Sequence, residues 1–157
     1  MTFILLTHDR EWEKPSNTGC LVAEVLAEDT ERCRWARKDP DPGLLDRLNT
    51  YPAVLVYPSA SAAMFNPADS ATDTQFVLID ATWQQSRKIV NRSPYLQSLS
   101  QVSVQPVRAP VYNLRRNQIT GGLCTAECVM ALLDALGRHH EADELADKLQ
   151  ALINLNP

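Results

Sequence analysis

The chain has 157 residues, of which 45% are hydrophobic and 22% charged. A chain of this size and composition can bury one hydrophobic core without disulfides or metal ions, so we expect one domain over residues 1–157. Its apolar runs are far too short to span a bilayer, and the N-terminus lacks the charged segment that opens a secretory signal. These features exclude a membrane-spanning protein and predict a cytoplasmic one without a membrane partner.

Charged residues are unevenly distributed along the chain, although the formal net charge is only −4. No Asp or Glu occurs between Ala81 and Ala126. The positive residues of that segment are Arg87, Lys88, Arg92, Arg108, Arg115 and Arg116. Such a cluster favours a surface that meets nucleic-acid phosphates, and the alternative is a solvated surface with no partner. The acidic total therefore does not exclude an RNA-binding protein.

Continuous apolar runs over residues 3–6, 53–57 and 76–79 predict three strands. Because these runs do not alternate with polar residues, both faces of each strand are expected to be covered, as in a parallel sheet. Residues 102–104 form a shorter, alternating run, which we expect nearer a sheet edge. A helix should begin near Cys20, a second one should cover residues 60–63, and residues 39–43 should form a turn.

Two amphipathic helices are expected in the last third of the chain. The apolar stripe of the first is Val129, Leu132, Leu133 and Leu136, and that of the second is Ala142, Leu145, Ala146, Leu149, Leu152 and Ile153. Gly137 lies between them and can end the first helix. Alternating strands and helices predict an α/β fold, with a mostly parallel sheet flanked by helices.

Ligands of such folds bind beyond the carboxyl ends of the strands, and polar residues follow the predicted strands. Asp80 comes directly after the run at 76–79, with Thr82 and Trp83 behind it. The carboxylate of Asp80 can cap the following helix. Alternatively, it lies partly desolvated at a binding site, where burial keeps it basic enough to accept a proton.

Three further clusters contain residues suited to binding a ligand: Asn17-Thr18-Gly19, Tyr57-Pro58-Ser59, and the segment from Tyr112 to Glu127. The glycines at 121 and 122 allow a tight loop before a helix whose first amides are free to bind. Helix capping and strand termination explain the same residues without a ligand. No dinucleotide-binding or P-loop glycine pattern is present, which argues against both of those classes.

The four cysteines, Cys20, Cys33, Cys124 and Cys128, lack the spacing of a zinc site and are expected to be reduced thiols. Cys124 and Cys128 would share one helix face, so a metal site completed by histidines, or a thiol enzyme, stays as an alternative.

Together, Asn17-Thr18-Gly19, Tyr57-Pro58-Ser59, Asp80-x-Thr82-Trp83, Leu114-Arg115 and Cys124-Thr125-x-Glu127 closely resemble the DTW domain family. The resemblance covers nearly the whole chain and implies a SPOUT-like fold with a knot in the C-terminal third. It implies a tRNA-uridine aminocarboxypropyltransferase that uses S-adenosylmethionine. Many members carry a cysteine-rich zinc-binding segment ahead of the domain, whereas this sequence opens on its first strand.

On this reading Asp80 is the predicted general base for uridine N3, and Glu127 is the second candidate. The predicted cofactor-binding residues are Thr18, Pro58, Ser59, Asp80, Thr82, Leu114, Arg115, Leu123, Cys124 and Thr125. The predicted RNA-binding residues are Trp83, Arg87, Lys88, Arg92 and Arg116, and no metal ligand is predicted. Arg115 suits either the cofactor carboxylate or an RNA phosphate, and Trp83 either stacks on a base or fills the core.

Two rival functions stay open at this point. An RNA methyltransferase would use the same cofactor and fold but present a different carbon to the base. A non-catalytic RNA-binding module would keep the fold without the reaction. The sequence indicates neither the modified uridine nor the oligomeric state.

Overall fold

The computed structural model describes residues 1–114 and 122–157 and is built around a parallel sheet. Its strands are β1 (Thr2–Thr7), β2 (Thr30–Arg34), β3 (Ala53–Val56), β4 (Ala63–Met64), β5 (Gln75–Asp80) and β6 (Ser100–Ser103). They lie in the order β2-β1-β5-β3-β6-β4. All pairs in this described part are parallel, which confirms the predicted fold class.

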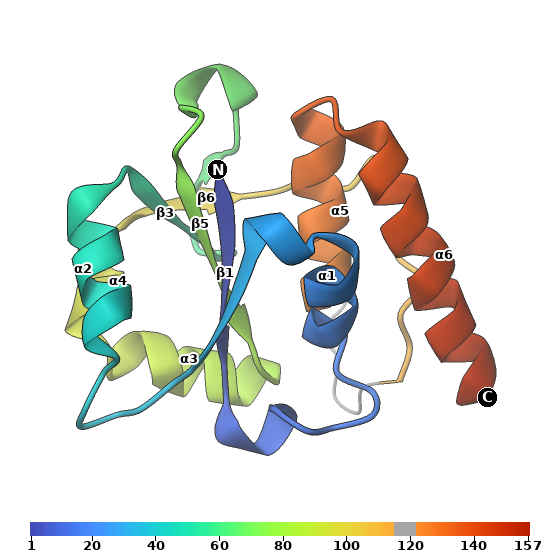
Figure 1. Ribbon diagram of the computed structural model, residues 1–157, viewed down its shortest axis with the longest axis horizontal. Helices are drawn as coiled ribbons and strands as arrows, with labels where there is room; N and C mark the ends of the chain where they lie inside the picture. The colour runs from blue at the N-terminus through green and yellow to red at the C-terminus, as the bar shows by residue number, and fades with distance from the viewer. Residues whose placement is uncertain (115–121) are drawn as a thin grey trace.

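Helices cover both faces of the sheet (Figure 1). One face is packed against α1 (Gly19–Val25), α5 (Thr125–Ala135) and α6 (His139–Leu155), and the other against α2 (Pro42–Thr50), α3 (Trp83–Asn91) and α4 (Pro94–Gln97). Short 3-10 helices occur at η1 (Asp9–Glu11), η2 (Ala27–Asp29) and η3 (Pro67–Asp69). Among the described residues, no helix combines the length and apolarity needed to cross a membrane.

Alternate residues of the central strands point into two separate hydrophobic cores. Phe3 and Leu5 of β1 face the α1, α5 and α6 side, whereas Ile4 and Leu6 face the α2, α3 and α4 side. All four are buried, as the continuous apolar run predicts for a strand covered on both faces. The strands expected at 3–6, 53–57 and 76–79 are therefore confirmed.

Two local predictions differ from the structure. β2 was not predicted, because its sequence Thr-Glu-Arg-Cys-Arg is mostly polar, and only Cys33 of this edge strand is buried. The helix expected over residues 60–63 is wrong. Ala62 closes a turn by donating to the Ser59 carbonyl (3.1 Å), and the following residues pair with β6 as β4. Four small residues are too few to nucleate a helix, so strand pairing prevails.

The helices begin and end where their capping residues place them. Thr82 and Gln85 form a reciprocal capping box at the start of α3, with bonds of 3.2 and 2.9 Å. Gly137 follows α5 with φ of 76°, a conformation that glycine adopts without strain. The apolar stripe predicted for α6 is confirmed, since Ala142, Leu145 and Leu149 are buried.

The chain leaves β1 and β5, which are neighbours, on opposite faces of the sheet: β1 leads to α1, and β5 leads to α3 (Figure 1). Such a switch point is where open α/β sheets bind ligands. We call the ends of β2, β1, β5 and β3, with the segments that follow them, the carboxyl edge. The expected knot depends on residues 115–121 and lies outside the described residues.

Candidate active site

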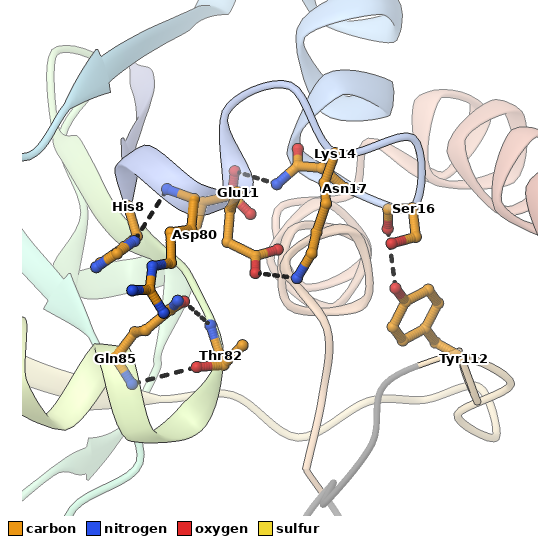
Figure 2. Close-up of polar contacts among 10 residues, drawn as sticks. His8, Glu11, Lys14, Ser16, Asn17, Asp80, Thr82, Gln85 and Tyr112 are labelled. Carbon is orange, nitrogen blue, oxygen red and sulfur yellow. Dashed lines mark hydrogen bonds and ion pairs between the residues drawn. The ribbon is translucent and has the colours of Figure 1, made fainter.

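The carboxylate of Asp80 lies at the centre of the carboxyl edge. Asp80 ends β5 opposite Thr7 of β1, and its side chain is fully buried. Oδ2 accepts hydrogen bonds from Thr7 Oγ1 (3.1 Å) and Asn17 Nδ2 (2.8 Å), the second of which is drawn in Figure 2. Oδ1 accepts one from Thr125 Oγ1 (2.9 Å). These four residues, the Asp80 cluster, join two strands to the start of α5 and to the loop before α1.

The buried carboxylate of Asp80 is bound by polar groups that carry no charge. Within the described part of the chain, all the partners of Asp80 are neutral hydroxyl and amide donors. A buried carboxylate needs such donors, because removing it from water unpaired is costly. Asp80 does not cap α3, since Thr82 fills that position. The capping alternative for Asp80 is therefore wrong.

Gly19 brings the backbone of α1 against this carboxylate. A Cβ atom at Gly19 would lie 2.4 Å from Asp80 Oδ2 and 2.8 Å from its Cγ. Asn17 caps α1, because its Oδ1 accepts from the Cys20 amide (3.0 Å), whereas the buried Thr18 hydroxyl accepts from the Ala126 amide (3.2 Å). The motif Asn17-Thr18-Gly19 thus connects α1, Asp80 and α5.

Glu127, the second candidate base, is bound by the backbone. Its Oε1 accepts from the amides of Val111 (2.8 Å) and Tyr112 (3.0 Å), and its Oε2 from that of Cys124 (3.0 Å). The Tyr112 hydroxyl in turn donates to the Ser16 carbonyl (2.8 Å; Figure 2). Glu127 is buried, and its carboxylate holds the backbone of residues 111 and 112 against α5.

Two leucines predicted to bind the cofactor lie close to this segment. Leu114 is half-buried against the core, and Leu123 lines a small hollow between α5 and residues 106–111. Both leucines are only partly buried, whereas Cys124, directly before α5, is fully buried.

The thiol of Cys124 is poorly suited to act as a nucleophile. Burial, and then the negative charge of Glu127, raise its pKa well above the ordinary value. Cys128 is half-buried on the next turn of α5. No three His, Cys, Asp or Glu side chains of the described residues gather in a way that could hold a metal ion.

The other predicted residues lie at the ends of β3 and β5. Trp83 stacks on Tyr57, with ring centroids 5.7 Å apart and an interplanar angle of 12°. Pro58 is exposed, and the half-buried Ser59 bonds to Gln101 of β6 and to Ser61. Thr82, although half-buried, is occupied in capping α3. The structure therefore places these residues at the same edge of the sheet as Asp80. Thr82 and Trp83 follow β5, and Pro58 and Ser59 follow the neighbouring strand β3.

The predicted cations divide into two groups. Arg87, Lys88 and Arg92 are exposed on α3. Arg108 instead forms ion pairs with Asp134 (2.8 Å) and Asp143 (2.8 Å), and these bonds raise its pKa. Arg108 is thereby engaged within the fold. Arg115 and Arg116, like Gly121, lie outside the described residues.

Thr7 and Tyr112 are site residues that the sequence analysis did not single out for a role. A hydroxyl at the end of the first predicted strand was a usable signal for Thr7, because parallel strands end at the same edge of a sheet. Nothing in the sequence pairs the Tyr112 hydroxyl with the carbonyl of Ser16, a contact across 96 positions.

Fold and site together define an α/β protein whose buried Asp80 cluster lies at the switch point of a parallel sheet, where proteins of this class bind ligands. A family model described as the DTW domain matches residues 1–156. The chain belongs to the DTW domain family, as the five motifs predicted.

Two relatives carry functional names. The chain is 26% identical over 155 residues to "tRNA-uridine aminocarboxypropyltransferase 2" of Macaca fascicularis, a match that covers 94% of this chain and 52% of the relative. It is 34% identical over 90 residues to the protein of the same name from Drosophila melanogaster, covering 57% and 36% of the two chains. The chain thus spans about half the length of the macaque relative. No solved structure matches it significantly.

Proposed function

We propose that the protein transfers the 3-amino-3-carboxypropyl group of S-adenosylmethionine to N3 of a uridine in tRNA and releases methylthioadenosine. Membership of the DTW domain family over residues 1–156, with two relatives named as tRNA-uridine aminocarboxypropyltransferases, is the observation that carries the proposal. The chain acts as one catalytic domain in the cytoplasm. A site at the switch point of the sheet supports the assignment.

The chemical character of the carboxyl edge fits this cofactor. Leu114 and Leu123 offer apolar contact to an adenine ring. The expectation that the first amides of α5 are free is wrong for Cys124 and Ala126, because these amides donate to Glu127 and to Thr18. A carboxylate at Asp80, which meets no cation among the described residues, would attract the positive sulfonium. When bound, the cofactor supplies a carbon already activated by that sulfonium.

The proposed binding residues differ in how they can contribute. Pro58 and Ser59 are accessible at the end of β3, and Thr82 lies at the end of β5. Thr18, Cys124 and Thr125 are buried, so they would shape the site through the backbone or through Asp80. Arg115 remains a proposed partner of the cofactor carboxylate or of an RNA phosphate, beyond the residues that the structure describes.

Uridine N3 carries a proton at neutral pH, so a base must remove it before or during the attack. We propose Asp80 for this step. Both of its oxygens accept hydrogen bonds from side chains, those of Thr7, Asn17 and Thr125, and it would take the proton after one of these side chains turns away. Glu127 is less favoured, because its three donors are backbone amides, which cannot turn away as side-chain donors can.

Trp83 is proposed as a stacking surface for the uracil or the adenine. Its ring is half-buried and already faces Tyr57. Each further base stacked on an aromatic ring contributes about 1–3 kcal/mol. The remaining work of the protein is to hold N3 in line with the reacting carbon, which can account for much of the rate of a displacement.

The test uses two forms of the cofactor, one labelled in the methionine carboxyl group and one in the methyl group. After incubation with the protein, tRNA should carry label from the carboxyl form only, and methylthioadenosine should appear. Label from the methyl form, with S-adenosylhomocysteine, would show a methyltransferase instead. Binding of tRNA without transfer of either label would indicate a non-catalytic RNA-binding module.

A further inference from the structure

The exposed cations that lack an ion pair among the described residues lie at one end of the sheet. Cations far from the carboxyl edge are all paired: Arg47 with Glu31, Arg108 with Asp134 and Asp143, Arg138 with Asp29 and Glu141, and Lys148 with Glu24. The exposed cations without an ion pair in the part of the chain that the structure describes are Arg10, Arg37, Lys38, Arg87, Lys88 and Arg92. We call these six the edge cations.

The edge cations follow the carboxyl ends of three strands. Arg10 lies in η1 after β1, Arg37 and Lys38 follow β2, and Arg87, Lys88 and Arg92 belong to α3 and its end after β5. In Figure 1, η1, α3 and the segment after β2 gather at the same end of the sheet. Because the strands are parallel, residues from three distant stretches of sequence reach one surface.

Packing around Trp35 and His8 holds these segments together. Trp35 donates its backbone amide to the Thr7 carbonyl (2.9 Å) and its indole N–H to Ser93 Oγ (2.8 Å), which links the chain after β2 to the end of α3. The rings of His8 and Trp35 stack with centroids 6.2 Å apart. His8 also donates its amide to the Asp80 carbonyl (3.1 Å), so this packing adjoins the candidate active site.

Arg10 and Lys88, which come from two of these segments, both lie close enough to His8 to affect its pKa. Burial lowers the pKa of His8, and the positive charges of Arg10 and Lys88 lower it further, against opposing effects of Glu11 and Asp9. On the other side of α3, burial raises the pKa of Tyr57 at the end of β3, and the positive charge of Arg87 opposes that rise. The cations of α3 therefore lie on both sides of the end of β5.

Carboxylates offset this surface only in part. On the same segments Asp9 pairs with Arg34 and Glu11 with Lys14, which cancels those charges. Glu13, Asp39 and Asp41 are exposed there, and Asp41 is occupied in capping α2. The six edge cations therefore outnumber these three exposed carboxylates. On α6, which packs on one face of the sheet, acidic residues outnumber basic ones.

We propose that the edge cations form the phosphate-binding surface for the RNA substrate and hold its backbone on both sides of the Asp80 site. This inference rests on the proposed function for the identity of the substrate. It adds Arg10, Arg37 and Lys38 to the cations expected from the sequence and removes Arg108. Unpaired cations suit this use, because a lysine or arginine already held by a carboxylate would have to break that pair to meet a phosphate.

The experiment compares two double variants that remove the same charge. In Arg37→Gln/Lys38→Gln two edge cations are lost, and in Arg47→Gln/Lys148→Gln two paired cations are lost. Binding of unfractionated tRNA to each protein is measured by fluorescence anisotropy between about 50 and 200 mM salt. The edge variant should lower the slope of log affinity against log salt by about 0.9 per lost contact, and the control should keep the parental slope.

Equal slopes for the two double variants would overturn the proposal, as would an unchanged KM for tRNA in the edge variant. A third variant, Lys88→Gln, tests the other side of the surface. It should lower the slope of log affinity against log salt by about 0.9, the value for one lost phosphate contact. If the parent binds tRNA through these residues but transfers no labelled group, the proposed function fails and the surface stands. If the parent transfers the labelled group but the edge variants bind tRNA as the parent does, the proposed surface is wrong and the proposed function stands.

Discussion

Asp80 and Asp134 are two carboxylates whose burial is compensated in different ways. Asp80 is buried among neutral donors, with no cation among its partners in the described structure. Asp134, with 4% of its side chain exposed, receives two bonds from Arg108 and one contact from His139. Neutral donors preserve a net negative charge, whereas the arginine cancels it. In the described residues, the first arrangement therefore binds a carboxylate without neutralising it, whereas the second joins α5 to α6 through an ion pair.

The largest expected effect comes from removing the charge of Asp80. In Asp80→Asn the transfer rate should fall about 10²- to 10⁴-fold, the usual range for loss of a general base. The matched control is Asp134→Asn, which removes a hydrogen-bonded carboxylate far from the carboxyl edge and should keep the parental rate. Single-turnover transfer to tRNA measures both. A parental rate in Asp80→Asn would exclude Asp80 as the base.

Crowding the same carboxylate tests how tightly the Asp80 cluster is packed. Gly19→Ala places a Cβ 2.4 Å from Asp80 Oδ2 and should lower the free energy of unfolding by about 1–3 kcal/mol, as overpacking does elsewhere. Gly43→Ala is the control, since its nearest contact would be 3.3 Å, to the exposed Asp41. Urea unfolding compares the two. Equal stabilities of these variants would contradict the close packing of α1 against Asp80.

A smaller effect is expected at the paired carboxylate. Arg108→Met should cost roughly 1 kcal/mol or less of stability, because Arg108 is about one-third exposed and screened by solvent. The hydrogen bond from Arg108 lowers the pKa of Asp134 below its usual 3.8, so its stabilising effect is complete above that value. This stabilising effect is lost as the pH falls from 3.8 through the lowered pKa of Asp134. Thermal melting from about pH 6 to pH 2.5 should show the two proteins converging in acid. A stability difference that grows in acid would contradict this assignment.

The smallest effect is predicted for the thiols. Burial raises the pKa of Cys33 to about 12 and raises that of Cys124 further. Neither thiol should react with iodoacetamide at neutral pH in the folded protein, and treatment should leave transfer intact. Peptide mass spectrometry before and after unfolding measures the labelling. Rapid labelling of Cys124 with loss of transfer would revive the thiol-enzyme alternative.

Prediction from sequence was most reliable where burial on both faces makes a strand apolar throughout. Phe3, Leu55 and Phe76 lie in such runs, and their strands are the centre of the sheet. It failed at β2, where an edge strand with one buried side chain has no apolar pattern to detect. It also failed at residues 60–63, where pairing with β6 outweighs the helix propensity of small residues.

The motifs were recognisable in the sequence, but their physical connections were not. Asn17, Asp80 and Thr125 stand in three separate motifs and meet around one carboxylate. Arg108 illustrates the opposite outcome, because it belonged to the predicted basic cluster and is held by two aspartates from α5 and α6. Neighbours in sequence share a charge pattern, but hydrogen bonds depend on distance in space.

By itself the sequence determined the α/β class, the family and the placement of Asp80 directly after a buried strand. These follow from local composition and order, which each segment carries alone. Only the tertiary structure decided that neutral donors surround Asp80 and that Glu127 binds the backbone of residues 111 and 112. It also decided that the exposed cations with no ion pair in the described part of the chain gather at the carboxyl edge. The reason is that parallel strand order brings together residues 45 to 108 positions apart, and no local pattern encodes that order.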